Sequence, residues 1–429
     1  MLTATRSLDA WLERIERLHP SEIELGLDRI AAVRDRLPLA MDFPVILVGG
    51  TNGKGSVCAV LESIYHSAGF VTGLYTSPHL LAYNERVRVD GHHVDDTELV
   101  AAFEQVEAAR GEIPLTYFEF GTLAAALMFR NRSVDVAILE VGLGGRLDAV
   151  NVFEPACSVV VSVDVDHVDY LGDNREAIGF EKAGIFRPGL PAVCGDEDPP
   201  ASLLKHASAI GAQLHLIGRD FGHVNASTGW QFWNAAGKMA GLPMPGLRGA
   251  PQLDNAAAAL ECVRILHPVL PVQMAALRNG LLDASVMARF QVLATSPPVI
   301  LDVAHNPGAT RALSTNLQEM PCAGRTLAVF GVLQDKDIGQ IVSVLARQVD
   351  HWFACGLGVA RGAPAGKLGD TIAQVTGKDR VETFDNVANG LAAARDVARD
   401  SDRILVFGSF YTVSEALKSS EALRTLARC

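Results

Sequence analysis

The sequence predicts an α/β protein with two domains, an N-terminal P-loop-type domain built on a mostly parallel sheet and a smaller C-terminal Rossmann-like α/β domain. The chain has 429 residues, whereas a single hydrophobic core stops growing at about 250 to 300 residues. Apolar runs of strand length alternate with stretches of helical spacing, which is typical of a parallel sheet covered on both faces. A second series of this kind begins near residue 285, so we predict domains at residues 1–285 and 286–429.

The composition indicates a globular protein that works in the cytoplasm. Hydrophobic residues make up 49% of the chain and charged residues 20%, and no uninterrupted apolar stretch is long enough to span a bilayer. The first segment has the spacing of an amphipathic helix over residues 8–18 and does not resemble an export signal. The seven cysteines are scattered and never spaced as C-x-x-C, which suits a reducing compartment and disfavours a zinc knuckle.

Charge and periodicity narrow the range of partners. The net charge of −12 argues against general nucleic-acid binding, so any site for an anion must be local. The chain lacks coiled-coil heptads, which together with its acidic surface favours a monomer. We therefore expect no nucleic-acid partner and no membrane partner.

In the first predicted domain, the buried strands are "FPVILVGG", "VDVAILEVG" and "ACSVVVSVDV", which are rich in Val and Ile without polar alternation. The intervening segments Asp96–Arg110, Thr116–Asn131 and Arg175–Phe186 have helical spacing. In sheets of this type, ligands bind at the carboxyl ends of the strands. We therefore expect the functional residues in the loops that follow these strands.

The second predicted domain contains the strands "PPVILDVAHNP", "RTLAVFGVL", "HWFACGLG" and "RILVFGSF", with helices between them. A segment rich in glycine and proline, "GWQFWNAAGKMAGLPMPGLRGAPQ", precedes the Ala-rich helix "NAAAALECVRIL" and this second series.

The stretch "GGTNGKGS" follows the strand Val45–Val48 and leads into a helix. Its glycines allow backbone N–H groups to surround phosphate oxygens, and the helix N-terminus and Lys54 add positive charge. The strict pattern G-x-x-x-x-G-K-[ST] fails, because Val48 occupies the first glycine position and Gly55 follows the lysine. The alternative is a glycine-rich turn without chemical function, but the order strand, loop, helix favours a phosphate site.

Three successive strand ends carry acidic, hydroxyl or imidazole side chains. In chain order these residues are Ser77 and His79; Glu140, Arg146 and Asp148; and Asp164, Asp166, His167 and Asp169. Taken singly, a histidine such as His167 is more often structural, and carboxylates at strand ends often cap helices. Converging on a phosphate site, these groups are typical ligands of Mg²⁺, which is held by few protein groups together with phosphate and water.

Ten motifs, in order and at the expected approximate spacing, resemble the Mur ligase superfamily, and within it the folylpolyglutamate synthases and bacterial dihydrofolate synthases. They are "GTNGKGS", "TSPHL", "NERVRV", "TYFEFGTLAA", "EVGLGGRLDAVN", "DVDHVDYLG", "EKAGIFRPG", "DVAHNP", "GVLQDKD" and "FGSFYTVSEAL". The "RGAPA" and "GSFYTV" segments, with "VDVDHVDYLG", are most similar to the bifunctional members, which make dihydrofolate and then extend it.

The resemblance implies an ATP-dependent ligase that activates a carboxylate as an acyl phosphate, which the amine of L-glutamate then attacks. The implied substrates are dihydropteroate, tetrahydrofolate and its polyglutamates, and L-glutamate; two Mg²⁺ ions are also implied. A monofunctional folylpolyglutamate synthase is the main alternative. A cell-wall Mur ligase is disfavoured because only about fifty residues precede the phosphate loop. A P-loop phosphohydrolase or nucleotide-gated regulator would need neither "TYFEF" nor a modified lysine.

The resemblance also assigns residues to ATP and metal. It places the ATP phosphates on Thr51, Asn52, Gly53, Lys54, Gly55 and Ser56. It gives Asn255 to the adenine side, Arg289 to the γ-phosphate, Asp302 to the ribose and His305 to the nucleotide and glutamate side. It implies one Mg²⁺ on Ser77 and Glu140, and a second on Glu140, His167 and Lys182 as its carbamate. The implied catalytic residues are Lys182, His167, Glu140, Arg289 and His305.

The implied pterin site comprises Ile23, Glu24, Leu25, Thr116, Tyr117, Phe118, Glu119, Leu147, Asp148 and Ala149. Phe118 either stacks on the pterin or belongs to the core, whereas the loop position of Asp148 disfavours a core role. Without the resemblance, the pattern predicts that Lys182 is a helix-surface ammonium paired with Glu181 or with a neighbouring turn.

The chain departs from the family at two places in the nucleotide site. It has Met287 and Ala288 where the family commonly has Pro-Gly before Arg289, and "GAPQLDN" in place of H-Q-x-x-N before Asn255. A nucleotide held between two domains would also require domain closure.

Overall fold

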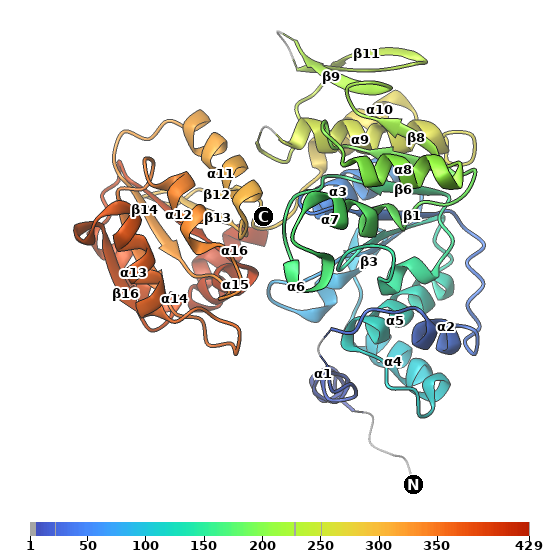
Figure 1. Ribbon diagram of the computed structural model, residues 1–429, viewed down its shortest axis with the longest axis horizontal. Coiled ribbons are helices and arrows are strands. Elements are labelled where there is room, and N and C mark those ends of the chain that lie inside the picture. The colour runs from blue at the N-terminus through green and yellow to red at the C-terminus, as the bar shows by residue number, and fades with distance from the viewer. Residues whose placement is uncertain (1–5, 22, 227–228, 250, 429) are drawn as a thin grey trace. The chain divides into compact units, whose positions relative to one another are not determined.

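The computed structural model describes residues 6–21, 23–226, 229–249 and 251–428 (Figure 1). The chain divides into two compact units. Unit 1 comprises Met1–Gly246 and Gln252–Ser285, and unit 2 comprises Leu247–Pro251 and Val286–Cys429. Each unit is described by itself below. No helix within the described residues combines the length and the apolar character needed to cross a membrane.

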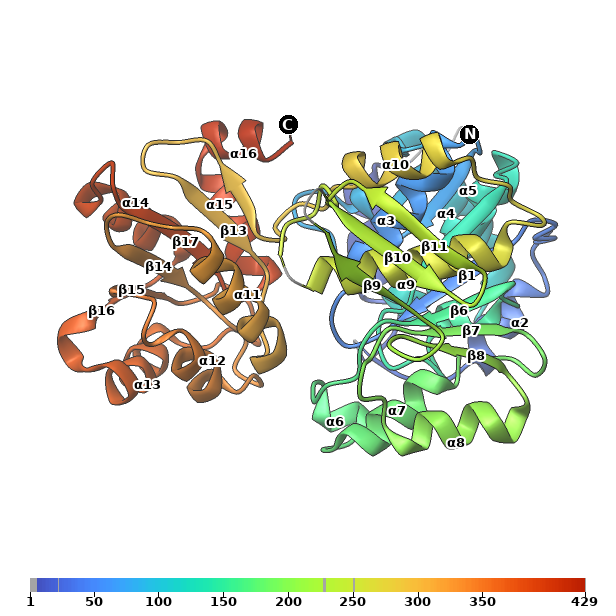
Figure 2. The ribbon, with the colours of Figure 1, turned by 90° about the horizontal axis from the view of Figure 1, so that it is seen from above.

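Unit 1 is built on an eight-stranded sheet in the order β4-β3-β2-β5-β1-β6-β7-β8 (Figure 2). Its strands are β1 Val45–Gly49, β2 Thr72–Tyr75, β3 Val87–Val89, β4 His92–His93, β5 Val136–Glu140, β6 Cys157–Val160, β7 Pro191–Cys194 and β8 Gln213–Leu216. All neighbours from β2 to β8 pair in parallel, and β3 and β4 extend one edge in antiparallel fashion. Every residue of β1 and β5 is buried, as the apolar runs predict.

The helices of unit 1 cover both faces of this sheet. They are α1 Leu8–Glu16, α2 Asp28–Arg34, α3 Lys54–Ser67, α4 Asp96–Arg110, α5 Tyr117–Asn131, α6 Val168–Leu171, α7 Arg175–Ala183, α8 Ala201–Ile210, α9 Pro251–Leu266 and α10 Met274–Asp283. Val45 and Leu47 of β1 join one core with residues of α1, α2, α4, α5, α7 and α8. On α10, a Cβ at Gly280 would lie 2.4 Å from the Ile64 Cα atom of α3, so glycine permits the close contact of these two helices.

A three-stranded antiparallel sheet lies within the glycine-rich segment, where the sequence pattern gave no strand prediction. It consists of β9 Phe221–Asn225, β10 Trp230–Asn234 and β11 Gly237–Leu242, in the order β11-β10-β9. In β10 the side chains of Trp230 and Phe232 are buried, and those of the residues that follow each of them are partly exposed. This alternation is the ordinary signal of a half-buried strand, but the surrounding glycines and prolines obscure it.

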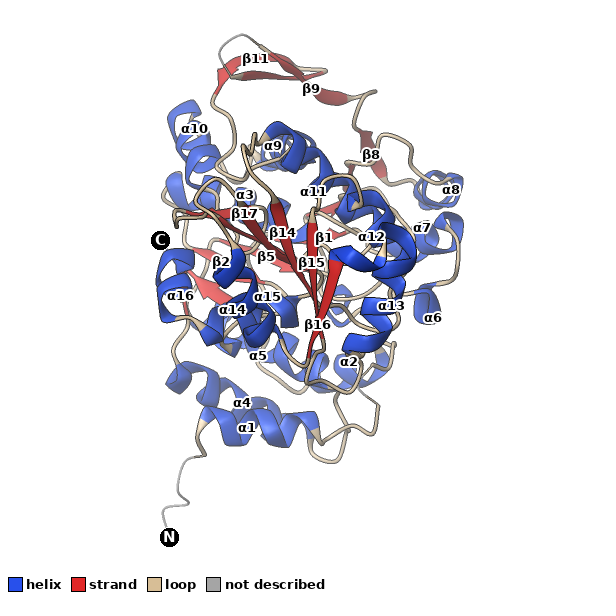
Figure 3. Cartoon of the chain, turned by 90° about the vertical axis from the view of Figure 1, so that its left-hand side faces the viewer, coloured by secondary structure: helices blue, strands red, loops and turns tan. Residues whose placement is uncertain are grey.

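Unit 2 contains a six-stranded sheet in the order β12-β13-β17-β14-β15-β16, of which Figure 3 labels β14 to β17. The strands are β12 Gln291–Leu293, β13 Val299–Asp302, β14 Thr326–Phe330, β15 His351–Cys355, β16 Val381–Phe384 and β17 Arg403–Phe407, and only β12 pairs antiparallel. The helices are α11 Pro307–Glu319, α12 Ile338–Leu345, α13 Ala365–Thr376, α14 Val387–Val397, α15 Phe410–Ser419 and α16 Glu421–Arg428. The predicted α/β fold class is thereby confirmed for both units.

Candidate active site

The glycine-rich loop joins β1 to α3, so its backbone N–H groups meet the positive end of a helix that begins at Lys54. Gly53 has φ of +86°, and a Cβ there would lie 2.6 Å from the Asn255 Oδ1 atom. The side chain of Asn255 therefore lies directly against the loop, although Asn255 follows Gly53 by 202 residues in sequence. The Lys54 ammonium donates to the carbonyls of Gly50 (3.0 Å) and Thr51 (3.3 Å), which places this charge over the loop.

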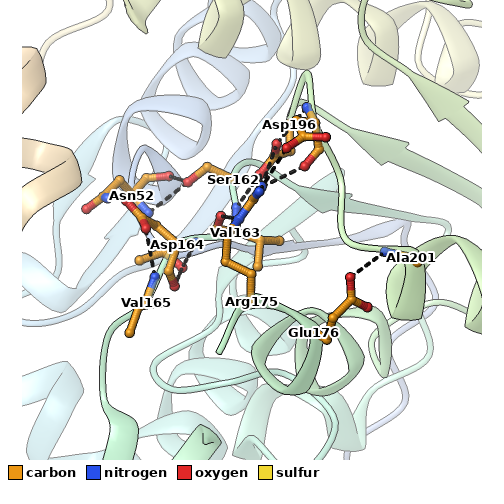
Figure 4. A network of polar contacts seen from close by, with 11 residues as sticks. Asn52, Ser162, Val163, Asp164, Val165, Arg175, Glu176, Asp196 and Ala201 are labelled. Atoms are coloured by element: carbon orange, nitrogen blue, oxygen red, sulfur yellow. Dashed lines mark hydrogen bonds and ion pairs between the residues drawn. The ribbon is translucent and has the colours of Figure 1, made fainter. Parts of the chain in front are cut away.

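The loop after β6 is bound to the glycine-rich loop by several hydrogen bonds, part of which Figure 4 shows. The Thr51 amide donates to the Ser162 carbonyl (2.8 Å) and the Asn52 amide donates to the Ser162 hydroxyl (3.0 Å). The Thr51 hydroxyl donates to the Asp164 carbonyl and accepts from the Asp164 amide, both at 3.0 Å. Ser162, which the sequence patterns did not single out, therefore fixes the shape of the loop.

Arg175 at the start of α7 binds the loop after β6 and the segment after β7 (Figure 4). Its Nε donates to the Val163 carbonyl (2.9 Å), and its other nitrogens pair with Asp196 (3.3 Å) and Asp198 (3.0 Å). The Val163 amide donates in turn to the Asp196 carboxylate at 2.6 Å. This network holds the segment that contains Asp164, Asp166 and His167.

Glu140 and Ser77 lie side by side at the ends of β5 and β2. The Glu140 carboxylate is buried and accepts a hydrogen bond from the Ser77 amide at 3.0 Å. A Cβ built on Gly55 would lie 3.8 Å from Glu140 Oε1, so this carboxylate faces the first turn of α3. A carboxylate and a hydroxyl beside a phosphate loop fit Mg²⁺, which is bound by few protein oxygens together with phosphate. The described residues contain no cluster of three or more His, Cys, Asp or Glu suited to a metal, and the predicted ligand set includes only two such residues.

Lys182 on α7 is 3% exposed, so its interpretation as a surface ammonium is wrong. Glu181 pairs instead with Arg146, at 2.9 Å. Burial, reinforced by the positive charge of Lys54, lowers the pKa of Lys182 to about 7. At neutral pH a large fraction of this amine is therefore uncharged, and the uncharged amine is the form that reacts with carbon dioxide.

The three segments predicted for the pterin lie together in unit 1. The Gly26 amide, directly after Leu25, donates to the Leu147 carbonyl at 3.2 Å. The Arg29 guanidinium pairs with Glu24 on one side and with Glu119 at 3.3 Å on the other. Ile23, Leu25, Tyr117 and Leu147 are partly buried, Glu24 is exposed and Ala149 is buried. Arg29 links the segments, and no motif had pointed to it.

The prediction that disfavours a core role for Asp148 is wrong. The carboxylate is 3% exposed and accepts hydrogen bonds from the amides of Leu143 (2.8 Å) and Val150 (3.1 Å). Burial raises the pKa of Asp148 to about 7, although these amides favour its charged form. Asp148 therefore organises its own loop, which the sequence pattern could not reveal.

Thr116 and Glu119 form a capping box at the start of α5. The Thr116 amide donates to the Glu119 carboxylate (2.7 Å), and the Glu119 amide donates to the Thr116 hydroxyl (3.2 Å). Between them, the ring of Phe118 stacks on Tyr75 with centroids 5.7 Å apart. A Cβ on Gly142 would lie 2.8 Å from the Phe118 ring. The Phe118 ring therefore packs against Tyr75 and Gly142, as the core interpretation predicted, while its side chain stays partly exposed.

Arg86, in the "NERVRV" segment, connects the Ser77 loop with the start of α5. Its guanidinium lies 5.4 Å from the ring centroids of both Tyr83 and Tyr117. Its Nε donates to His79 Nδ1 at 2.9 Å, and no ion pair of Arg86 occurs within the described part of the chain. The sequence pattern did not assign Arg86 a function, and its guanidinium is a cation that can still pair with a carboxylate.

In unit 2, Asp302 organises the loop that contains Arg289. Its buried carboxylate accepts hydrogen bonds from the amides of Phe290 (2.8 Å) and Ala304 (2.7 Å). Burial raises the pKa of Asp302, and the nearby Arg289 opposes this shift. The Arg289 guanidinium lies 5.5 Å from the Phe410 ring centroid, and His305 Nδ1 donates to the Val303 carbonyl at 2.8 Å. Arg289, Asp302 and His305 thus share one end of this sheet.

Ala288 has φ of +58° and is fully buried, at the position where the family commonly has glycine. An L-residue with a Cβ pays about 1 kcal/mol or more in the left-handed region, so we expect Ala288→Gly to leave the free energy of unfolding unchanged or to raise it by up to about 1 kcal/mol. Ala288→Val should lower it by about 2 kcal/mol or more, because a β-branched residue fits this region poorly. Urea denaturation of the purified variants measures both effects.

The matched control is Ala312→Gly in the interior of α11, which should lower the free energy of unfolding by about 1 kcal/mol. Equal destabilisation by the two glycine substitutions would contradict the strain at Ala288.

Comparison with known families and proteins gives a consistent result over the whole chain. Residues 48–263 match the Mur ligase middle domain, and residues 288–410 match the Mur ligase, glutamate ligase domain. The dihydrofolate synthase/folylpolyglutamate synthase of Escherichia coli (strain K12) is 43% identical over 423 residues, which cover 98% of this chain and 97% of that protein. The protein of the same name from Haemophilus influenzae is 38% identical and covers 96% of this chain and 98% of its own length.

Two solved structures are similar over nearly the full length. One is E. coli FolC in complex with DHPP and ADP, with a TM-score of 0.93 and 42% identity, covering 99% of this chain and all of that one. The other is a bifunctional folylpolyglutamate synthase/dihydrofolate synthase with Mn, AMPPNP and L-glutamate bound. Its TM-score is 0.89 at 42% identity, and the match covers 97% of this chain and 98% of that one.

Proposed function

Because this chain belongs to the Mur ligase family, among the dihydrofolate synthase/folylpolyglutamate synthases, we propose that it joins L-glutamate to dihydropteroate and to tetrahydrofolate with consumption of ATP. The observation that carries this proposal is the placement of Glu140 and Ser77 against the first turn of α3, directly beside the glycine-rich loop. A nucleotide-dependent switch also needs Mg²⁺ beside its phosphate loop, whereas a ligase must in addition hold an acid and an amine.

The first step joins two anions, so the site must offset their repulsion. A carboxylate oxygen of the folate attacks the γ-phosphorus of ATP, and ADP leaves from the acyl phosphate that forms. The backbone amides of Gly53, Lys54, Gly55 and Ser56, the ammonium of Lys54 and Arg289 are the groups that we assign to the phosphates. One Mg²⁺ held by Ser77 and Glu140, and a second held by Glu140, His167 and the Lys182 carbamate, would supply further positive charge.

In the second step, the amine of L-glutamate attacks the acyl carbon, the amide bond forms, phosphate leaves and the nitrogen loses a proton. We assign Asn255 to the adenine, Asp302 to the ribose and His305 to the glutamate side of this arrangement. Lys182 acts as its carbamate, an anion that would face the second Mg²⁺, where an ammonium would repel it. The burial of Lys182 and its lowered pKa support this modification.

For the folate, we assign the pterin to the joined segments around Leu25, Phe118 and Leu147, and a carboxylate of the substrate to Arg86. Arg86 lies between those segments and the Ser77 loop, as a substrate reaching from pterin to phosphate would require. The cytoplasmic location and the monomeric state remain predictions.

A product assay on the purified protein tests the function. ATP, Mg²⁺ and L-glutamate are supplied with dihydropteroate in one reaction and with tetrahydrofolate in another, and the products are separated by chromatography. We expect glutamylated product in both reactions, and negligible ATP consumption until both the folate and L-glutamate are present.

If only tetrahydrofolate is extended, the proposal that the protein makes dihydrofolate is wrong and the monofunctional alternative is favoured. ATP hydrolysis at the same rate without a folate would instead favour a phosphohydrolase or a nucleotide-gated regulator.

A further inference from the structure

The turn that contains Arg289 has a strained backbone on both sides of this residue. Ala288 has φ of +58° and Phe290 has φ of +45°. The side chains of both are buried, whereas that of Arg289 is partly exposed. L-residues in the left-handed region cost conformational free energy and persist only where the surrounding structure holds them. Strain of this kind gathers at functional sites, so the groups that hold the turn bear on the function of Arg289.

Hydrogen bonds from two neighbouring strands hold this turn. The Phe290 amide donates to the carboxylate of Asp302, the last residue of β13, at 2.8 Å. The Val303 amide, directly after β13, donates to the Ala288 carbonyl at 3.1 Å. On the other side, the Ala288 amide donates to the side-chain oxygen of Gln291, the first residue of β12, at 3.0 Å. The conformation around Arg289 therefore depends on the side chains of Asp302 and Gln291.

Gln291 is itself anchored to the last helix of unit 2. Its Nε2 atom donates to the Ala427 carbonyl of α16 at 2.7 Å, and its backbone pairs with Leu301 of β13. The side-chain amide of glutamine contains one acceptor oxygen and one donor nitrogen. Both are in use here, because the oxygen accepts from Ala288 and the nitrogen donates to α16. Gln291 thus connects the strained turn to the C-terminal helix.

The far end of the Arg289 side chain is restrained as well. Its guanidinium lies 5.5 Å from the ring centroid of Phe410, the first residue of α15. The turn fixes the backbone end of this long side chain, and the aromatic ring fixes the charged end. A side chain that is restrained at both ends loses little conformational entropy when it binds an anion.

We propose that Gln291 is a positioning residue for Arg289, which it holds in place for the γ-phosphate of ATP without contacting the nucleotide. Its oxygen holds the turn and α16 holds its nitrogen, so the C-terminal helix contributes to ATP recognition through one side chain. ADP lacks the γ-phosphate, so Gln291 strengthens the binding of ATP and not that of ADP. This inference rests on the proposed assignment of Arg289 to the γ-phosphate.

Isothermal titration calorimetry of the full chain with AMPPNP or ADP, each with Mg²⁺, tests the proposal. Gln291→Met keeps the size of the side chain but can neither accept from Ala288 nor donate to Ala427. We expect it to weaken AMPPNP binding by about tenfold and to change ADP binding by less than about twofold. A merely structural role would weaken both ligands alike. Gln340→Met, the same change at an exposed position of α12, is the matched control and should bind both ligands as the natural chain does.

Gln291→Glu is the conservative variant. Its carboxylate can still accept from the Ala288 amide, although it cannot donate to Ala427. Its loss of AMPPNP affinity should therefore be smaller, about threefold, again with ADP binding unchanged. Unchanged ADP binding also shows that a variant is folded. A loss as large as that of Gln291→Met would overturn the role of the hydrogen bond to Ala288.

Arg289→Met, alone and combined with Gln291→Met, separates this inference from the proposed function. If Gln291 acts through Arg289, the double variant should bind AMPPNP no more weakly than Arg289→Met alone. Losses that multiply in the double variant, or equal losses for AMPPNP and ADP in Gln291→Met, would overturn the inference and leave the ligase proposal standing. If Arg289→Met binds AMPPNP and ADP as the natural chain does, the assignment of Arg289 to the γ-phosphate is wrong and this inference fails with it.

Discussion

Lys182→Ala is expected to lose activity with dihydropteroate and with tetrahydrofolate alike, by on the order of a hundredfold or more. The buried amine of Lys182 is the group that we propose to be carbamylated, and alanine cannot provide the resulting anion. Steady-state rates with each folate at saturating ATP measure the effect. Lys205→Ala on α8 removes an exposed lysine and should leave both rates unchanged.

A short carboxylic acid such as acetate or propionate should restore part of the activity of Lys182→Ala, because it can occupy the space of the missing carbamate. ¹³C NMR after equilibration with labelled bicarbonate should give a carbamate signal in the natural chain and none in the variant. The pKa of Lys182 near 7 makes the amine mainly uncharged above neutral pH, so the signal should grow as pH rises through 7. Near-normal rates for Lys182→Ala would refute the role of the carbamate.

Glu140→Gln is the second substitution with a large expected effect, a loss of turnover of about a thousandfold. Glutamine has the same shape and its carbonyl oxygen can still accept from the Ser77 amide, so the loop after β2 should keep its place. The lost group is the negative charge that we assign to both Mg²⁺ ions. Rates measured over a range of Mg²⁺ concentrations should show that Glu140→Gln needs far more Mg²⁺ than the natural chain to reach half of its maximal rate.

Glu104→Gln is the matched control, since it makes the same chemical change at an exposed position. An unchanged Mg²⁺ dependence in Glu140→Gln would exclude Glu140 as a metal ligand.

Features that depend on residues close together in sequence were predicted correctly. Uninterrupted Val and Ile runs identified the buried strands β1 and β5, because strands covered on both faces need no polar side. The glycine-rich loop was identified as a phosphate site because it lies between a predicted strand and a predicted helix. β9 to β11 were missed because their glycine and proline content suggests turns, although Trp230 and Phe232 alternate with less buried residues.

Burial that arises from distant contacts was not predictable. Lys182 is buried because the loop after β5 packs onto α7, where the Arg146 amide donates to the Glu181 carbonyl at 2.7 Å. A Cβ on Gly145 would lie 2.8 Å from that same carbonyl oxygen, so glycine is needed for this approach. Arg29 likewise pairs with Glu119, and Arg86 lies against Tyr117, in segments far away in sequence, and no spacing rule contains that information.

The hydrogen bonds that join Thr51 and Asn52 to Ser162 and Asp164 have a consequence for how nucleotides are exchanged. The glycine-rich loop is already hydrogen-bonded to the loop after β6, so it does not have to become ordered when ATP binds. Little conformational entropy is therefore lost on binding. ATP and ADP should then meet the same rigid receptor. Discrimination between ATP and ADP would then depend on the γ-phosphate and on the residues that contact it.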